Sequence, residues 1–223
     1  MRRTILGLGA AASAALIAAS WRHWLPMDLT EVFGFVTGAW CVWLTVEENV
    51  WNWPIGIAND IFFIVLFLRA RLFADMGLQV VYVVLGILGW YWWLHGGRGR
   101  TVLHVSRASA ATALTLAALG TLSTFGMTLY LRHVRDSAPF WDALTTALSL
   151  AAQYLLTKKL IENWHVWMSA DVIYVALYAY KHLYLTGGLY LLFLALCVMG
   201  LRQWRESQAS HPSWEGMAES VHG

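Results

Sequence analysis

The sequence predicts an all-α integral membrane protein, a bundle of seven spanning helices preceded by an extra short N-terminal helix. Three observations support this fold class. Of the 223 residues, 59% are hydrophobic and only 13% are charged, whereas about a quarter of the residues of a soluble domain carry charge. Seven apolar stretches have the length that a helix needs to cross a bilayer. The first three stretches share a sequence pattern with the last three.

The composition excludes several functions. Fourteen Trp residues suit a protein with two lipid–water interfaces, and the chain is too apolar for a soluble enzyme. A net charge of +2 without a dense basic run excludes a nucleic-acid partner. Cys41 and Cys197 lie within apolar stretches, so we interpret both as small core residues.

Residues 1–29 are expected to form a short hydrophobic helix and a linker. The apolar run from Thr4 to Ser20 follows Arg2 and Arg3, a pattern shared by signal peptides, signal anchors and short retained helices. We favour a retained helix, because a multispanning protein does not need a cleaved signal.

The seven-span domain covers residues 30–207. Charges, Pro or Gly bound each span, and the connections are too short to hold a soluble catalytic module. The predicted spans are 30–47, 54–71, 76–94, 108–130, 138–157, 165–182 and 187–204. Residues 208–223 contain Ser, Glu, Pro and His and are expected to form a disordered tail.

Lys and Arg residues set the expected orientation. If the N-terminal run spans the bilayer, nine of them fall on the side of the N-terminus and six on the other. The densest short cluster, from Arg98 to Arg107, lies on the first side. The positive-inside rule makes this side cytoplasmic, which places the C-terminus inside the cell.

An internal repeat relates residues 30–94 to residues 138–204. One constant shift along the chain superimposes Asn52 on Asn163, Trp53 on Trp164, Asp60 on Asp171, Gly77 on Gly188, Gly89 on Gly200 and Trp93 on Trp204. Four spans separate the copies, so both cross the membrane in the same direction, with the span 108–130 as an unpaired linker helix. This three-plus-one-plus-three parallel repeat is typical of transporters with a site between the halves. Chance agreement between stretches of biased composition is the alternative.

The sixth span carries one aromatic and acidic face. Its members keep within one third of the circumference at about 100° per residue: Trp164, Trp167, Asp171, Tyr174, Tyr178 and Lys181. The second span repeats the first five offsets with Trp53, Gly56, Asp60, Phe63 and Phe67. At about 1.5 Å per residue, the two carboxylates lie roughly 10 Å below the interface.

Ionised carboxylates at that depth are costly, so they face a partner, a water-filled cavity or a substrate. Aromatic rings beside a carboxylate attract a flat organic cation. The alternatives are interface-belt positions for Trp53 and Trp164, core packing for the tyrosines, and pairing of Asp171 with Lys181.

Amide side chains supply a second ingredient of the predicted site. Asn59, Gln153 and Asn163 offer a donor and an acceptor to a carboxamide, a pyrimidine or ribose hydroxyls. Interhelical hydrogen bonds are the alternative role. The sequence contains no phosphate-binding loop, H-E-x-x-H motif or evident Ser-His-Asp grouping. We therefore expect no enzymatic activity, metal site or cofactor.

The segment from Glu162 to Tyr190, with the W-x-x-W pair Trp164 and Trp167, resembles the signature stretch of the bacterial PnuC family of vitamin transporters. The resemblance covers the seven spans, through W-N-W-P-I-G-I-A-N-D at 51–60 and G-W-Y-W-W at 89–93. It implies a fold related to the SWEET sugar transporters and a homotrimer in the bacterial inner membrane. It also implies facilitated diffusion of nicotinamide riboside, an NAD precursor, driven by phosphorylation of the vitamin inside the cell by a separate kinase.

The resemblance assigns roles to the candidate residues. Trp164 and Trp167 would stack on or gate the aromatic ring of the vitamin, and Asn163 and Gln153 would bind its carboxamide or ribose. Asp171 and Asp60 would set the preference for a cation, and Tyr174 and Tyr178 would line the pathway. Trp53 and Asn59 complete the predicted substrate-binding set. On this basis we expect Trp164→Ala to lose binding while the protein still folds.

Two substrates remain open in this interpretation. Nicotinamide riboside and thiamine are both flat cations, and the family also contains riboflavin transporters. Some nicotinamide riboside members carry Asn at the position of Asp171. We favour nicotinamide riboside, with thiamine as the alternative.

An interpretation from another class is a seven-helix membrane sensor or photoreceptor without transport. The position of Lys181 weakens the photoreceptor alternative, because Lys181 lies at the end of the sixth span and a retinal Schiff base would need a lysine in the middle of the last helix.

Overall fold

The computed structural model describes residues 2–22, 24, 29–71, 73–135, 138–180 and 184–210. These residues form eight α-helices and no strand, which confirms the all-α class. The helices are α1 (Arg2–Trp21), α2 (Leu29–Val46), α3 (Asn52–Ala70), α4 (Phe73–His95), α5 (Ala110–His133), α6 (Pro139–Thr157), α7 (Asn163–Tyr180) and α8 (Tyr184–Ser210). A helix thus lies over each predicted span and over the N-terminal run. Helix α8 continues to Ser210, so residues 208–210 are helical, and the rest of the predicted tail lies outside the described residues.

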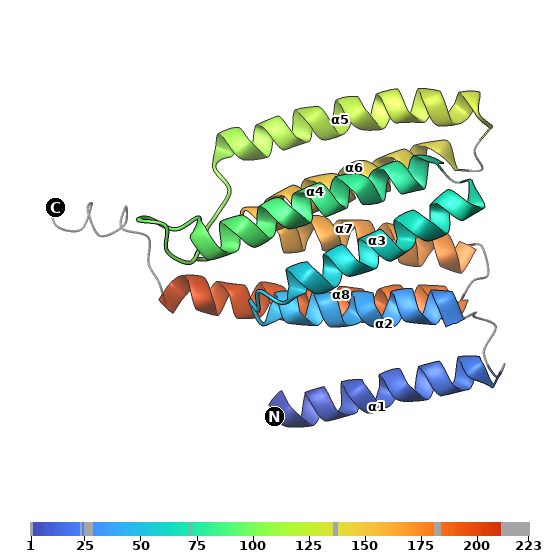
Figure 1. The fold of residues 1–223 in the computed structure, drawn as a ribbon. Coiled ribbons are helices and arrows are strands. Elements are labelled where there is room, and N and C mark those ends of the chain that lie inside the picture. The colour runs from blue at the N-terminus through green and yellow to red at the C-terminus, as the bar shows by residue number, and fades with distance from the viewer. Residues whose placement is uncertain are drawn as a thin grey trace, which may run out of the picture.

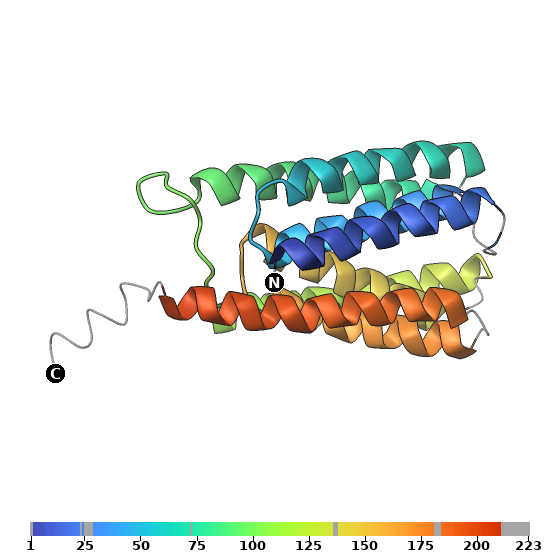
Figure 2. The ribbon, with the colours of Figure 1, turned by 90° about the horizontal axis from the view of Figure 1, so that it is seen from below.

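Six of the helices form a closed ring. Each contacts two neighbours in the order α2, α3, α4, α6, α7, α8 and back to α2. Helix α5 lies outside this ring against α6, and α1 lies outside it against α2, so the two occupy opposite edges of the molecule (Figure 1). Figure 2 shows α2–α4 on one side of the bundle and α6–α8 on the other. The ring therefore joins two three-helix halves, α2–α4 and α6–α8.

Local sequence signals explain where several helices begin. The side chain of Ser109 caps α5 by accepting a hydrogen bond of 3.1 Å from the backbone N–H of Thr112. Pro139 opens α6, where its missing N–H costs nothing, and Asp142 lies in the first turn near the positive end of the helix dipole.

The outer surface of the bundle is apolar. Leu114, Leu122 and Phe125 on α5 are each more than half exposed. Among the described residues, three helices are long and apolar enough to cross a membrane, over Asn52–Arg69, Met76–His95 and Ala110–His133. Such a surface suits contact with lipid, because backbone polar groups in the interior of a helix are paired with one another.

The repeat is visible in the backbone. The connection between α2 and α3 and the connection between α6 and α7 make the same series of backbone hydrogen bonds at equivalent positions of the repeat. Glu48 and Lys159 occupy equivalent places in these connections, and both have left-handed backbone conformations, with φ of 52° and 55°. The matching bonds and the matching left-handed residues argue against chance agreement between the halves.

Helix α1 packs on the first half of the ring in the same way as the linker helix α5 packs on the second half. The shift that relates the two halves also carries α1 onto residues 113–132, which lie inside α5. Each helix packs on the first helix of the half that follows it, α1 on α2 and α5 on α6. The indole Nε1 of Trp40 on α2 donates a hydrogen bond of 3.1 Å to the Ser13 hydroxyl on α1. Sequence similarity between α1 and α5 is too weak to reveal this relation.

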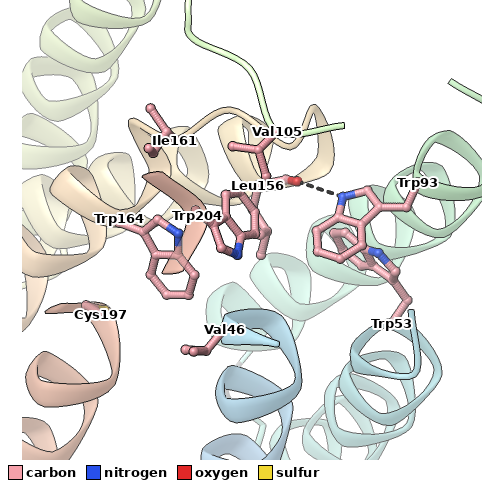
Figure 3. Close-up of a cluster of buried hydrophobic side chains, with 9 residues drawn as sticks. All are labelled: Val46, Trp53, Trp93, Val105, Leu156, Ile161, Trp164, Cys197 and Trp204. Atoms are coloured by element: carbon pink, nitrogen blue, oxygen red, sulfur yellow. Dashed lines mark hydrogen bonds between the residues drawn. The ribbon is translucent and has the colours of Figure 1, made fainter. Parts of the chain in front are cut away.

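A cluster of four tryptophans closes one end of the ring, which we call the tryptophan end (Figure 3). Trp53 meets Trp93 at a centroid distance of 5.4 Å and an interplanar angle of 89°. Trp164 meets Trp204 at 5.3 Å and 84°. The two edge-to-face pairs occupy equivalent positions of the repeat. They show that both halves build the same core from matching residues.

Two glycines make room for these indoles. A Cβ atom at Gly89 would clash with the ring of Trp53, and one at Gly200 would clash with the ring of Trp164. We expect Gly200→Ala to lower the free energy of unfolding by about 1–3 kcal/mol, because the core cannot accept the added carbon without moving an indole. Thermal unfolding in detergent measures this effect.

The matched control is Gly120→Ala on α5, where an added Cβ meets nothing within 4 Å. This variant should be as stable as the parent or slightly more so, because alanine favours a helix more than glycine does. Equal melting temperatures for the two variants would contradict the packing at Gly200.

Candidate substrate site

Six of the ten predicted site residues lie on α7, and five of them belong to the predicted aromatic and acidic face. Trp164 and Asp171 are only 1% and 5% exposed, whereas Trp167, Tyr174 and Tyr178 are half-buried. Trp167 also packs against the core cluster of the tryptophan end. The predicted face is therefore turned into the bundle and not toward lipid. Lys181, the sixth member of this face, lies outside the described residues.

Trp53 and Trp164 are core residues and not interface-belt residues. A belt residue keeps its indole N–H at headgroup depth, but these side chains are only 3% and 1% exposed. The burial of Trp164 also corrects the expectation that Trp164→Ala would leave folding intact, because the substitution empties part of the core.

Four buried polar atoms in this region have no hydrogen-bond partner. They are Oδ1 of Asn52 and Nε1 of Trp53 in one half, and Oδ1 of Asn163 and Nε1 of Trp164 in the other. Nearly all buried polar atoms in proteins are paired, because an unpaired one costs free energy. Each half thus has one unpaired acceptor and one unpaired donor at the start of its middle helix. A polar substrate is the kind of partner that supplies both bonds.

Asp171 is buried and Asp60 is half-buried, and each interacts with a thiol. Asp171 accepts a hydrogen bond of 3.5 Å from the Sγ of Cys197 on α8, and Cys41 on α2 lies within electrostatic range of Asp60 on α3. Within the described residues, no Lys or Arg forms an ion pair with either aspartate. The carboxylates therefore have no resident positive partner there. The sequence analysis did not connect these thiols with the carboxylates, because the repeat has Ala152 and Gly86 at the positions equivalent to Cys41 and Cys197.

The predicted amides have different surroundings. The side-chain Nδ2 of Asn59 donates to the Thr37 hydroxyl and, at 3.4 Å, to the carbonyl oxygen of Gly34. Both acceptors are on α2, so Asn59 joins two helices, which was the alternative role considered for it. Gln153 is half-buried on α6. Asn163 donates through Nδ2 to the Leu160 carbonyl at 2.6 Å, which leaves its oxygen unpaired.

The tryptophan end is closed by contacts between the halves. The indole of Trp93 donates to the carbonyl oxygen of Leu156 at 3.1 Å, and the indole of Trp204 donates to that of Thr45 at 3.0 Å. Leu156 and Thr45 are equivalent positions in the repeat. Each half therefore donates an indole hydrogen bond to a carbonyl near the end of the first helix of the other half.

A buried ion pair reinforces this closure. The Lys159 ammonium lies 2.8 Å from a carboxylate oxygen of Glu48 and donates to the Leu103 carbonyl at 3.0 Å. Glu48 and Lys159 are themselves equivalent positions, so the repeat carries opposite charges where its two copies meet. Its neighbour Lys158 lies over the ring of Trp92, 3.3 Å from the centroid, and loss of hydration lowers the pKa of this ammonium.

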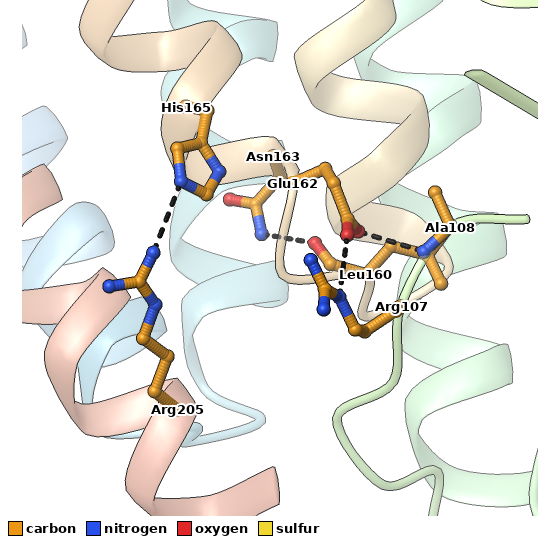
Figure 4. A network of polar contacts seen from close by, with 7 residues as sticks. All are labelled: Arg107, Ala108, Leu160, Glu162, Asn163, His165 and Arg205. Atoms are coloured by element: carbon orange, nitrogen blue, oxygen red, sulfur yellow. Dashed lines mark hydrogen bonds and ion pairs between the residues drawn. The ribbon is translucent and has the colours of Figure 1, made fainter. Parts of the chain in front are cut away.

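The connection between α4 and α5 is held against the start of α7 (Figure 4). Glu162 accepts a hydrogen bond of 2.8 Å from the backbone N–H of Ala108 and pairs with Arg107 at 3.4 Å. Next to this pair, His165 and Arg205 approach to 3.4 Å. Separation of the halves at this end must therefore move the loop as well.

Within the described part of the chain, no cluster of three or more His, Cys, Asp or Glu side chains is placed to hold a metal ion. Apolar helices around buried carboxylates and unpaired amides are the features of a multi-pass membrane transporter.

The chain belongs to the nicotinamide mononucleotide transporter family, whose model matches residues 28–206. It is 26% identical over 203 residues to the nicotinamide riboside transporter PnuC of Escherichia coli (strain K12), covering 79% of this chain and 85% of that protein. It is 25% identical over 195 residues to the riboflavin/roseoflavin transporter RibM of Streptomyces davaonensis, covering 84% of this chain and 90% of that one. The resemblance to PnuC predicted from the W-x-x-W segment is thereby confirmed.

The fold also matches a solved structure. The crystal structure of the vitamin B3 transporter PnuC superimposes with a TM-score of 0.68, covering 92% of this chain and 93% of that one at 20% identity. This match supports the helix arrangement. At this identity, it does not carry the substrate over.

Proposed function

We propose that this protein imports nicotinamide riboside by facilitated diffusion, with the vitamin bound between the two halves of the ring. The observation that carries this proposal is the pair of repeat-related carboxylates, Asp60 and Asp171, which lack a basic partner among the described residues. A cationic pyridinium ring supplies the missing charge, and the half-buried Trp167 offers a face for stacking. The E. coli relative is a nicotinamide riboside transporter, which agrees with this substrate.

The unpaired atoms of the middle helices suit the same ligand. A carboxamide brings one donor and one acceptor, which would complement the Asn163 oxygen and the Trp164 N–H once the tryptophan end opens. Sequence reasoning assigned Asn163 and Gln153 to the carboxamide or ribose and Tyr174 and Tyr178 to the pathway. We keep these roles as part of the proposal.

Transport then requires the tryptophan end to open. We propose that this end faces the cytoplasm, in line with the distribution of Lys and Arg, and that the ring together with the linker helix α5 forms the three-plus-one-plus-three core of a SWEET-like fold. Release inward would break the Glu48 to Lys159 ion pair and the two indole hydrogen bonds between the halves. Phosphorylation by a separate kinase would keep the vitamin inside. These steps, location in the bacterial inner membrane and assembly as a homotrimer follow from the family resemblance.

Thiamine is the alternative cationic substrate, and the similarity to RibM makes riboflavin a third candidate. Binding of all three vitamins to the purified protein, followed by intrinsic Trp fluorescence, separates these candidates. We expect nicotinamide riboside to bind and Trp167→Ala to weaken that binding by about 5- to 150-fold, since stacking of a base on an aromatic ring contributes about 1–3 kcal/mol.

The control is Trp141→Ala, because Trp141 on α6 is nearly half exposed on the outside of the bundle. Its affinity for the vitamin should equal that of the parent. If riboflavin is the only vitamin that binds, nicotinamide riboside is not the substrate and the proposed role of the carboxylates is refuted. Failure of all three vitamins to bind would refute the proposed function.

A further inference from the structure

Four tyrosines gather where the second half meets α4. Tyr174 and Tyr178 come from α7, Tyr190 from α8 and Tyr82 from α4. The Tyr190 ring lies 4.7 Å from that of Tyr174 and 5.3 Å from that of Tyr178, with interplanar angles of 35° and 26°. All four side chains are half-buried. They form an inner wall whose rings keep some accessible surface.

The hydroxyl groups of this wall gather beside hydroxyl groups of α6. The Tyr174 hydroxyl lies near those of Thr145 and Ser149, and the Tyr82 hydroxyl lies near that of Ser149. The hydroxyl groups of Tyr178 and Tyr190 also lie near each other. Thr145 donates its own proton to the Trp141 carbonyl at 2.9 Å, so its oxygen is left as an acceptor. We call these six side chains the hydroxyl wall.

The first half has no such wall. The repeat places Phe63, Phe67, Gly34, Gly38, Gln79 and Phe193 at the positions of Tyr174, Tyr178, Thr145, Ser149, Tyr190 and Tyr82. In the structure Phe63 and Phe67 stack at 5.6 Å, and Gly34 lies against the Phe63 ring. The second half thus has tyrosine hydroxyl groups at positions where the first half has the apolar rings of Phe63 and Phe67. Packing alone does not require this difference, because both halves share one fold.

The hydroxyl wall adjoins Asp171, because Tyr174 and Tyr178 follow it by about one and two helical turns on the same face of α7. Tyr190 also interacts electrostatically with Asp171, and Tyr82 with Asp60. A ligand whose flat cationic ring lies near the carboxylates therefore extends its remaining atoms toward these hydroxyl groups. Several neighbouring hydroxyls, each able to donate and accept, are complementary to a polyol.

We propose that the hydroxyl wall is a subsite for the polyhydroxylated part of the substrate, so that the chain selects vitamins carrying a ribosyl or ribityl group over thiamine. This inference rests on the proposed function and names a selectivity that the two carboxylates alone do not provide. A site built to bond substrate hydroxyls rejects analogues that lack them, because its own polar groups are then left unpaired.

The test is a double-mutant cycle between protein and ligand hydroxyls. Affinities are measured for the parent, Tyr174→Phe and Tyr190→Phe with nicotinamide riboside and its singly deoxygenated ribose analogues. Phenylalanine keeps the ring stacking, so folding should be retained, and melting temperatures verify this. We expect each variant to bind the riboside about fivefold more weakly, and at least one deoxy analogue to bind parent and variant equally.

Tyr130→Phe is the matched control, because Tyr130 on α5 is 61% exposed on the outer surface; its affinities should equal those of the parent. Variants that bind the riboside as tightly as the parent, or that weaken all analogues equally, overturn the hydroxyl-wall inference and leave the proposed function intact. A parent protein that binds no vitamin overturns both.

Discussion

Replacing Trp164 by alanine is expected to lower the free energy of unfolding by about 3–5 kcal/mol, the usual range for a large aromatic side chain removed from a core. Trp164 is 1% exposed, packs edge-to-face on Trp204 and fills the space left by Gly200. The change leaves a cavity at the tryptophan end that the surrounding helices fill only in part. Thermal unfolding in detergent should show a large fall in melting temperature, with loss of vitamin binding as a consequence.

Two further variants sharpen this prediction. Trp53→Ala removes the equivalent indole from the other half and should destabilise the protein to a similar extent, because Trp53 is 3% exposed and packs on Trp93. Trp141→Ala removes an exposed indole and should change the melting temperature little. If the Trp164→Ala and Trp141→Ala proteins have equal melting temperatures, the buried position of Trp164 is refuted.

Asp171→Asn is expected to weaken binding of nicotinamide riboside at least tenfold. A hydrogen bond to a charged group contributes about 1.5–3 kcal/mol, and this carboxylate is 5% exposed, so water screens it little. Asparagine keeps the shape and removes the charge. Neutral riboflavin should lose no affinity in this variant, so the ratio of the two affinities reports the charge directly.

Asp60→Asn tests the equivalent position of the other half, and comparison of the two variants shows which half holds the cation. Glu206→Gln, an exposed position near the end of α8, controls for a change of net charge. The role of Asp171 would be refuted by an Asp171→Asn protein that binds the riboside with unchanged affinity.

Local properties of the chain were sufficient to predict the helices and the repeat. A span is recognised by its apolar length, and a helical face by residue spacing, and both depend only on neighbours in sequence. For this reason the residues of α7 that share a face, from Trp164 to Tyr178, were found together. The equivalence of Asp60 and Asp171 followed from the same constant shift that relates the two halves.

Tertiary structure decided the roles within that face. Only the arrangement of the ring shows that Trp164 packs on Trp204 in the core, while Trp167 keeps accessible surface. Glu48 and Lys159 form an ion pair, although their equivalence in the repeat does not by itself predict that they are in contact. The counterpart relation of α1 and α5 likewise appears in which helix each one packs against.

The sequence by itself therefore determined an all-α membrane bundle, its family and the residue types of its candidate site. The tertiary structure alone decided which of these residues are core, where the halves lock together and where hydroxyl groups gather. The physical reason is that helix formation and bilayer insertion follow from local hydrophobicity, whereas burial and hydrogen bonding depend on which helices become neighbours. Contacts such as that of Tyr82 on α4 with Ser149 on α6 exist only once the ring has closed.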